Sequence, residues 1–228
     1  MDDASRQEFS PVPRPTIIFD FDGTVALGDG PLLAYARAVA ESALPDAGFV
    51  DAVALSLRGP RADVVDGYDL IRREALARGV GDDDLAAAYA LSRAQLGGPA
   101  ALVEAPRGLA AFLRDVDADR VLVTNAPATR LDEALAAMGL TGLFDRVVSD
   151  AAKPHGLERL LDELDPAAPV LSIGDVWRND LAPAHARGHA TAFVGGYADA
   201  DAMPTFRAPT LEELLPALAE WAASVRLP

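Results

Sequence analysis

Acidic side chains follow two short hydrophobic segments of the sequence. Asp20 and Asp22 come directly after one segment, and Asp175 follows another, with Asp180 a turn later. Two acids at i and i+2 point to the same side of an extended chain. Crowded carboxylates are unstable without a cation, and hard oxygen ligands with few imidazoles favour Mg²⁺. The sequence therefore predicts a magnesium site if the fold brings these acids together.

A hydroxyl, an amide and an ammonium occupy comparable places in the sequence. Thr124 and Asn125 follow a third hydrophobic run, and Lys153 is the single lysine of the chain. A carboxylate beside a metal, with a hydroxyl and an ammonium to bind phosphate, can act as a nucleophile and form an aspartyl phosphate. The ammonium would offset charge on the nucleophile and on the phosphoryl oxygens. Arginine does not replace such a compact charge, so Lys153 is the candidate for this role.

These side chains can meet only if the segments before them are neighbouring strands. Residues 16–19 are β-branched or aromatic and predict a strand buried on both faces, as in a parallel sheet. Alternating helices and strands then predict an α/β fold, a Rossmann-like doubly wound sheet with helices on both faces. The carboxyl ends of such strands converge on one crevice. The further strands are expected at 120–124, 147–148, 170–173 and 191–194, the last closing the core, and the helices at 108–115, 130–138, 157–164, 178–187 and 211–225.

The segment between the first strand and residue 106 has a different character. It carries helical periodicity interrupted by proline and glycine, and it contains no convincing strand. We therefore predict a helical cap domain over 27–105, inserted into a core built from 16–26 and 106–228. Arg58, Arg61 and Tyr68 flank the break at Gly59-Pro60 and are possible substrate contacts, with a surface position as the alternative for each arginine. The cap helices are expected at 32–44, 49–57, 63–78 and 82–96.

Composition excludes several classes of function. The chain has 228 residues, is 50% hydrophobic and carries a net charge of -15, so a phosphate backbone would be repelled and nucleic acid is not an expected partner. Absence of cysteine excludes disulfides and thiolate chemistry. Residues 1–15 lack the apolar centre of a signal peptide and predict a flexible arm. No apolar run is long enough for a membrane span. We expect a cytoplasmic protein, monomeric or homodimeric, without a membrane partner.

Four stretches in order resemble the motifs of the haloacid dehalogenase (HAD) superfamily. The resemblance runs from the first strand to Val194, and the helical insert sits where that superfamily carries its small cap domain. It implies that Asp20 is the nucleophile and a Mg²⁺ ligand, and that Asp175 completes the metal site. The four stretches are Asp20-Phe21-Asp22-Gly23-Thr24, Thr124-Asn125, Lys153-Pro154 and Gly174-Asp175-Val176-Trp177-Arg178-Asn179-Asp180.

The resemblance also implies roles for the remaining motif residues. Asp22 would be the general acid and base and would give the metal its backbone carbonyl. Thr124 and the backbone amide of Asn125 would hold the transferred phosphoryl group, and Lys153 would neutralise it. Asp180 would bind the metal through water or orient the site from outside the ligand shell.

Two features separate the activities found in that superfamily. Its dehalogenases lack the second acid of the first motif, whereas Asp22 is present here. Its phosphonate-cleaving members use a cap lysine, and this chain has only Lys153. The resemblance therefore implies a Mg²⁺-dependent phosphatase acting on a small phosphorylated metabolite. A sugar phosphomutase and a non-catalytic binding module on the same scaffold are the alternatives, although the intact acids argue against the second.

Overall fold

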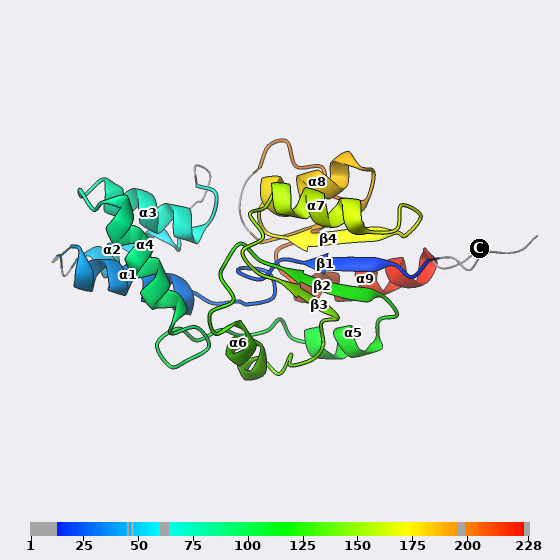
Figure 1. Cartoon of the computed structure of the whole chain (residues 1–228), viewed down its shortest axis with the longest axis horizontal. Helices are drawn as coiled ribbons and strands as arrows, with labels where there is room; N and C mark the ends of the chain where they lie inside the picture. The colour runs from blue at the N-terminus through cyan, green and yellow to red at the C-terminus, as the bar shows by residue number, and fades with distance from the viewer. Residues whose placement is uncertain (1–12, 45, 47, 60–63, 196–198, 226–228) are drawn as a thin grey trace, which may run out of the picture.

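The chain forms a helix-covered sheet with a group of helices at one end (Figure 1). The computed structural model describes residues 13–44, 46, 48–59, 64–195 and 199–225. The first and last parts of the chain build the sheet, and the middle part builds the helical group. We call these two bodies the core and the cap.

The described strands of the core form one parallel six-stranded sheet in the order β3-β2-β1-β4-β5-β6. The central strand β1 lies between β2 and β4, and its last residue Phe19 pairs with Leu122 and Ile173. The order reverses direction beside β1, which is where ligands bind in such sheets. The predicted α/β parallel sheet is therefore confirmed. Its strands are β1 (Thr16–Phe19), β2 (Asp119–Val123), β3 (Arg146–Val148), β4 (Val170–Gly174), β5 (Ala190–Val194) and β6 (Phe206–Ala208).

The prediction that the strand ending at Val194 closes the core is wrong. Strand β6 adds an edge strand beyond β5, with Phe206 paired to Ala192. It has only three residues, and the central Arg207 is exposed. So short a segment shows no alternation that a sequence pattern can detect, and edge strands are often kept short.

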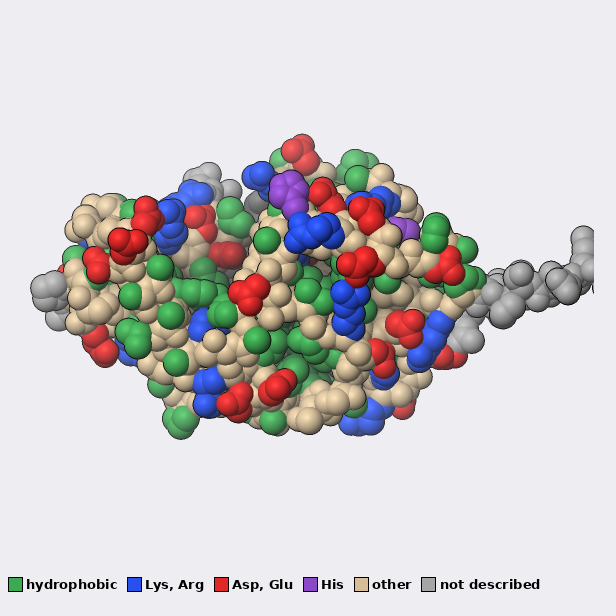
Figure 2. Space-filling model, in the orientation of Figure 1, with side chains coloured by type: hydrophobic (Ala, Val, Ile, Leu, Met, Phe, Trp, Pro, Cys, Tyr) green, Lys and Arg blue, Asp and Glu red, His purple; other side chains and the backbone are tan. Residues whose placement is uncertain are grey.

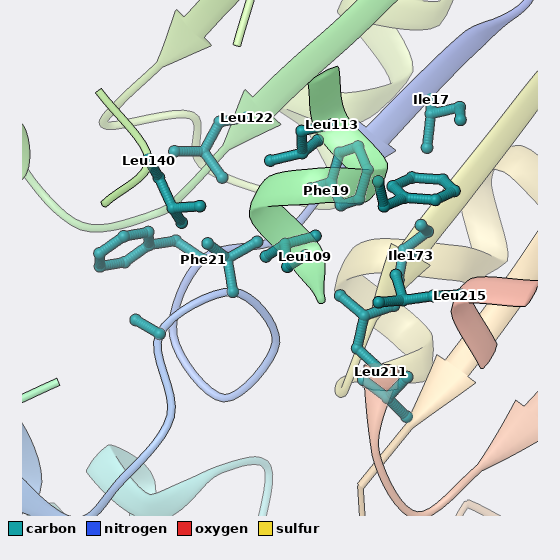
Figure 3. Close-up of a cluster of buried hydrophobic side chains, with 14 of the residues drawn as sticks. Ile17, Phe19, Phe21, Leu109, Leu113, Leu122, Leu140, Ile173, Leu211 and Leu215 are labelled. Carbon is teal, nitrogen blue, oxygen red and sulfur yellow. The ribbon is translucent and has the colours of Figure 1, made fainter. Parts of the chain in front are cut away.

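Helices cover both faces of the sheet, because alternate side chains of β1 point to opposite faces. Ile17 and Phe19 join the larger buried cluster, drawn in Figure 3, with leucines of α5, α6 and α9. Ile18 joins a second cluster with leucines of α7. The core helices are α5 (Leu109–Asp115), α6 (Leu131–Ala137), α7 (His155–Glu163), α8 (Ala182–Ala186) and α9 (Leu211–Ser224).

The segment predicted as one helix over 178–187 is divided. A π-helical turn, η1 (Trp177–Leu181), precedes α8. Pro183 lies in the first turn of α8, where the missing backbone N–H costs nothing. Asp180 lies in the π-helical turn, so the change of helix type affects a residue of the candidate site.

The cap helices pack around a buried cluster of their own, separate from the clusters of the core. Helix α3 begins at Gly67 rather than at residue 63, because Asp66 caps it by accepting the backbone N–H of Asp69 at 2.8 Å. None of the described helices is long and apolar enough to cross a membrane. The cap helices are α1 (Gly30–Ser42), α2 (Phe49–Ser56), α3 (Gly67–Leu76) and α4 (Asp82–Arg93).

Two connections join the cap to the core, and they run side by side. The backbone N–H of Leu27 donates to the carbonyl of Glu104 at 2.8 Å, and the N–H of Glu104 returns a bond to Leu27 at 3.1 Å. This antiparallel bridge ties the outgoing and returning chains together. The chain therefore passes between the two bodies as one hydrogen-bonded pair of segments.

The beginning of the described chain is attached to the core. Residues 1–12 of the arm predicted over 1–15 lie outside the described residues. Arg14 forms ion pairs with Asp117 at 3.1 Å and with Asp119 at 2.9 Å.

On the face that Figure 2 shows, acidic and basic side chains are interspersed over both bodies, without a continuous basic surface.

Candidate active site

A cavity of about 360 Å³ lies between the cap and the carboxyl ends of the core strands. The core lines it with residues that follow β1, β2, β3 and β4, and the cap lines it with the start of α1 and of α3. The fold thus brings together residues that are distant in the sequence. The singled-out residues among its lining are Asp20, Asp22, Tyr68, Thr124, Asn125, Lys153, Asp175 and Asp180.

Lys153 is held at the floor of the cavity by three acceptors. Its Nζ donates to Asp20 Oδ1 at 2.6 Å, to Asp180 Oδ1 at 2.7 Å and to the carbonyl of Val123 at 3.1 Å. An ammonium has three N–H groups, so all are used. The backbone N–H of Lys153 donates to Asn125 Oδ1 at 2.6 Å. With 4% of its side chain exposed, Lys153 is a buried, fully bonded cation.

The carboxylates around Lys153 exceed its single positive charge. Burial raises the pKa of Asp20 to about 7, since the lowering effect of Lys153 is opposed by Asp180. Burial also raises the pKa of Asp175 well above its usual value, and the charges of Asp20 and Asp180 add to that effect. Burial opposes the charge on Lys153, but Asp180 and Asp20 outweigh it and raise the lysine pKa. The site therefore favours a further cation.

The donor set fits a hard divalent cation. Asp20, Asp175 and Asp180 are buried, and each offers a carboxylate oxygen within 4.8 Å of the others. Oδ2 of Asp20 is buried and has no hydrogen-bond partner among the described residues. Asp180, in contrast, has both oxygens engaged, since its Oδ2 accepts the N–H of Val176 at 2.9 Å. Asp20 and Asp175 are thus the acids open to Mg²⁺, and Asp180 orients Lys153.

Local backbone structure places Asp175 and Asp180. Gly23 has φ +86°, and a Cβ there would collide with the Asp175 carboxylate; a Cβ at Gly174 would collide with Asp180. The π-helical turn then fixes Asp180, whose N–H donates to the Val176 carbonyl at 2.9 Å. Ser172 donates its hydroxyl to the carbonyl of Asp180 at 2.6 Å. The two glycines are required because the acids lie directly against the backbone.

The end of β2 offers groups that can bind a phosphoryl oxygen. Thr124 is buried, and its Oγ1 accepts the backbone N–H of Ala126 at 3.0 Å. A hydroxyl that accepts one bond still has its hydrogen to donate. Thr124 and Asn125 line the same cavity as Asp20 and Lys153, so this hydroxyl can donate to a molecule bound there.

The cap contributes a buried arginine that the sequence analysis did not single out. Arg93, the last residue of α4, donates from Nη1 to Asp22 Oδ1 at 2.9 Å, and 1% of its side chain is exposed. Tyr68 donates its hydroxyl to the same oxygen at 3.3 Å and accepts from Arg93 Nη1 at 3.2 Å. A signal was available, because Arg93 follows Leu85 and Tyr89 at i+8 and i+4, on the face of α4 that packs inward.

Charge and burial perturb the groups around Arg93. Burial opposes the charge of the guanidinium, but Asp22 outweighs it and raises the pKa of Arg93. Burial, with the charge of Asp22, raises the pKa of Tyr68 well above its usual value. Burial likewise raises the pKa of Tyr89 to about 12. Both tyrosines are therefore neutral, and Arg93 is the charged partner of Asp22.

The other cap predictions have different outcomes. Arg58 is exposed and does not line the cavity, because the turn that ends α2 leaves it on the surface. Arg61 lies outside the described residues. Tyr89, Asp29 and Asp66 line the cavity although the sequence analysis did not name them.

Solved structures resemble this chain over most of its length. No family model and no curated protein sequence matches it. A predicted phosphoglycolate phosphatase of Haemophilus somnus is 19% identical, with 90% of this chain and 98% of that one covered and a TM-score of 0.64. YfnB of Bacillus subtilis, bound to magnesium, is 18% identical with the same coverage and a TM-score of 0.62. L-2-haloacid dehalogenase of Xanthobacter autotrophicus is 19% identical, again with 90% and 98% coverage, at a TM-score of 0.59.

Proposed function

Because the chain has the fold of haloacid dehalogenase-like hydrolases, we propose that it is a Mg²⁺-dependent phosphatase of small phosphomonoesters. The observation that carries this proposal is the meeting of Asp20, Lys153 and Asp175 at one buried point of the cavity. There an ammonium holds a carboxylate whose other oxygen is buried and has no hydrogen-bond partner among the described residues, and the Thr124 hydroxyl belongs to the same cavity. This is the arrangement that nucleophilic attack on phosphorus requires.

The first half of the reaction transfers the phosphoryl group to Asp20. The carboxylate oxygen of Asp20 attacks phosphorus in line while Asp22 gives a proton to the leaving alkoxide oxygen. Lys153 holds the carboxylate and neutralises the phosphoryl oxygens. Mg²⁺, when bound by Asp20, Asp175 and the backbone carbonyl of Asp22, adds charge neutralisation at the same oxygens.

The second half hydrolyses the aspartyl phosphate. Asp22 takes a proton from the attacking water, and the carboxylate of Asp20 is released. The Thr124 hydroxyl and the backbone amide of Asn125 retain the phosphate during this exchange. Phosphate-monoester hydrolysis is among the slowest uncatalysed reactions, so the groups must act in a site that excludes bulk water. The position of the cavity between cap and core supports this requirement, because a seated cap limits the access of water from one side.

The presence of Asp22 in the cavity favours a phosphatase over a dehalogenase. An alkoxide leaving group needs a proton, whereas a halide does not. Asp22 lines the cavity and is directed by donors from the cap. The likeness to a magnesium-bound structure, YfnB, supports the choice of metal.

A phosphate-release screen tests the proposal. Wild-type protein with Mg²⁺ is incubated with phosphorylated acids, sugar phosphates and nucleoside monophosphates, beside Asp20→Asn and beside Asp29→Asn, an exposed acid of the same cavity. We expect release by the wild type and Asp29→Asn, loss with EDTA, and no release by folded Asp20→Asn. An equally active Asp20→Asn protein would contradict the proposal. An isomerised hexose phosphate in place of free phosphate would indicate a phosphomutase.

A further inference from the structure

Arg93 connects the two bodies of the molecule through a single carboxylate. It belongs to the last turn of α4 in the cap, whereas Asp22 follows β1 in the core. Their 2.9 Å ion pair is buried on the arginine side and 24% exposed on the aspartate side. The guanidinium does not line the cavity; Asp22 does. Arg93 therefore reaches the reaction only through Asp22.

The donors from the cap act on one oxygen of Asp22. Nη1 of Arg93 and the hydroxyl of Tyr68 both donate to Oδ1. Within the described residues, no hydrogen bond engages Oδ2. With Oδ1 fixed, rotation of the carboxylate is restricted, and Oδ2 remains the oxygen that can exchange a proton with a bound molecule.

A purely structural role fits Arg93 poorly. Its Nε and Nη2 are buried and have no hydrogen-bond partner in the described part of the chain. Buried polar groups are nearly always hydrogen-bonded, so an unsatisfied one calls for an explanation such as a role in catalysis. A buried ion pair is also weak evidence for stability. An arginine that leaves two nitrogens unsatisfied is costly, and its one strong contact is the carboxylate proposed as acid and base.

We propose that Arg93 is a positioning residue that fixes Oδ1 of Asp22 and so makes proton transfer from Oδ2 dependent on the seated cap. The inference rests on the proposed phosphatase function. In the first step Asp20 bonds to phosphorus, the Oδ2–H bond of Asp22 breaks and its proton goes to the leaving oxygen, which keeps the electron pair of the broken P–O bond. In the second step Oδ2 takes a proton from the water whose oxygen bonds to phosphorus, and the bond between phosphorus and Asp20 breaks. If the cap leaves the core, Asp22 loses its bond from Arg93 and with it its orientation.

Two substrates of similar shape distinguish a loss of Asp22 positioning from a general loss of enzyme activity. The leaving group of p-nitrophenyl phosphate departs with little protonation, whereas benzyl phosphate releases an alkoxide that needs the proton. A general acid contributes about 10²–10⁴-fold, so Arg93→Met should lower kcat for benzyl phosphate about 100-fold and kcat for p-nitrophenyl phosphate by less than about 10-fold. KM should change little for either, and Arg93→Lys should recover part of the loss.

Variants of Asp22 provide a second test of whether Arg93 acts through this carboxylate. Asp22→Asn should show the same preference for p-nitrophenyl phosphate, and the double variant should be no slower than Asp22→Asn alone, because coupled residues are not additive. Arg72→Met, which removes an exposed cap arginine paired with Asp82, is the matched control and should leave both rates unchanged. Arg93→Lys and Arg93→Gln replace the methionine variant if that protein does not fold.

The outcomes separate the inference from the function on which it rests. Equal loss with both substrates, or losses that multiply in the double variant, would overturn the role of Arg93 while leaving the phosphatase in place. Failure of wild-type protein to release phosphate from either compound and from the metabolite screen would remove both.

Discussion

The core side and the cap side of the cavity each present a buried cation to a carboxylate, but they hold it differently. Lys153, in the core, has three acceptors for its three N–H groups. Arg93, in the cap, has Asp22 and a tyrosine hydroxyl, and two of its nitrogens have no partner among the described residues. The lysine is bonded entirely within one body, so its position is independent of the cap. The arginine has its carboxylate partner only when the two bodies meet.

This difference divides the chemistry of the cavity. The core side brings together Asp20, which is the proposed nucleophile, its ammonium Lys153 and the acids that would hold Mg²⁺, in segments that follow paired strands of one sheet. The cap side orients Asp22, the proposed acid and base, through a contact that exists only while cap and core are seated together. Removal of the core cation should therefore damage both stability and turnover, whereas removal of the cap cation should chiefly affect one proton transfer.

The largest effect is expected for Lys153→Met. The substitution leaves Asp20 and Asp180 buried without their cation, and breaking a buried pair in this way costs about 3–5 kcal/mol. Loss of one charge-stabilising group also lowers kcat by about 10²–10³-fold. Urea unfolding in EDTA and phosphate release with Mg²⁺ measure the two effects.

Arg93→Met is the comparison for that experiment. Asp22 is 24% exposed and water can reach it, so we expect a smaller loss of unfolding free energy than for Lys153→Met. Lys153→Arg is a further control and should also lose activity, because a planar guanidinium does not reproduce three convergent N–H bonds. If Arg93→Met lost more unfolding free energy than Lys153→Met, the proposed difference in how the two cations are held would be wrong.

An intermediate effect is expected from pH in the absence of metal. Burial raises the pKa of Asp20 from 3.8 to about 7 in the folded protein. Between these values the folded state binds more protons than the unfolded state, so the free energy of unfolding falls as pH rises. Asp145, whose pKa the hydrogen bond from Arg120 lowers to about 2, contributes its own pH dependence only below this window.

Thermal unfolding in EDTA between pH 4 and pH 7 checks the sign. Wild-type protein should become less stable across the window, and Asp20→Asn should show a shallower slope because it cannot ionise at that position. Added Mg²⁺ should oppose the loss near pH 7, where the carboxylates are most charged. A metal-free protein that gained stability with rising pH would contradict the conclusion that burial raises the pKa of Asp20.

The smallest effect is expected for Tyr68→Phe, which removes one hydroxyl from the cap side. The hydroxyl lies 3.3 Å from Asp22 Oδ1, a long hydrogen bond beside the shorter one from Arg93. At that length an O–H···O hydrogen bond is weak, and it should contribute no more than the about 0.5–1.5 kcal/mol of a typical hydrogen bond, so kcat for benzyl phosphate should fall less than about 10-fold. Tyr35→Phe, whose ring lies 6.0 Å from that of Tyr68, is the control. A loss as large as that of Arg93→Met would assign the orientation to the tyrosine.

Most of the core could be predicted because parallel strands impose a simple rule. Residues after β1, β2 and β4 had to lie side by side once the strands were recognised, and the structure places Asp20, Thr124 and Asp175 on one cavity. Edge strand β6 was missed because three residues are too few to show the alternation of polar and apolar side chains that predicts a strand. The cap was predicted as helices, but only one of the side chains that face the site from it, Tyr68, was singled out. Of the three residues named there, Tyr68 lines the cavity and Arg58 does not.

The sequence by itself determined the parallel sheet and the order in which its polar strand ends occur, since hydrophobic runs and the residues that follow them are local features of the chain. Only the tertiary structure decided that Arg93 meets Asp22 and that both oxygens of Asp180 are engaged. Helical periodicity shows which face of α4 is buried but not what that face meets. That contact depends on how two separately packed bodies are seated on each other, and no local pattern encodes it.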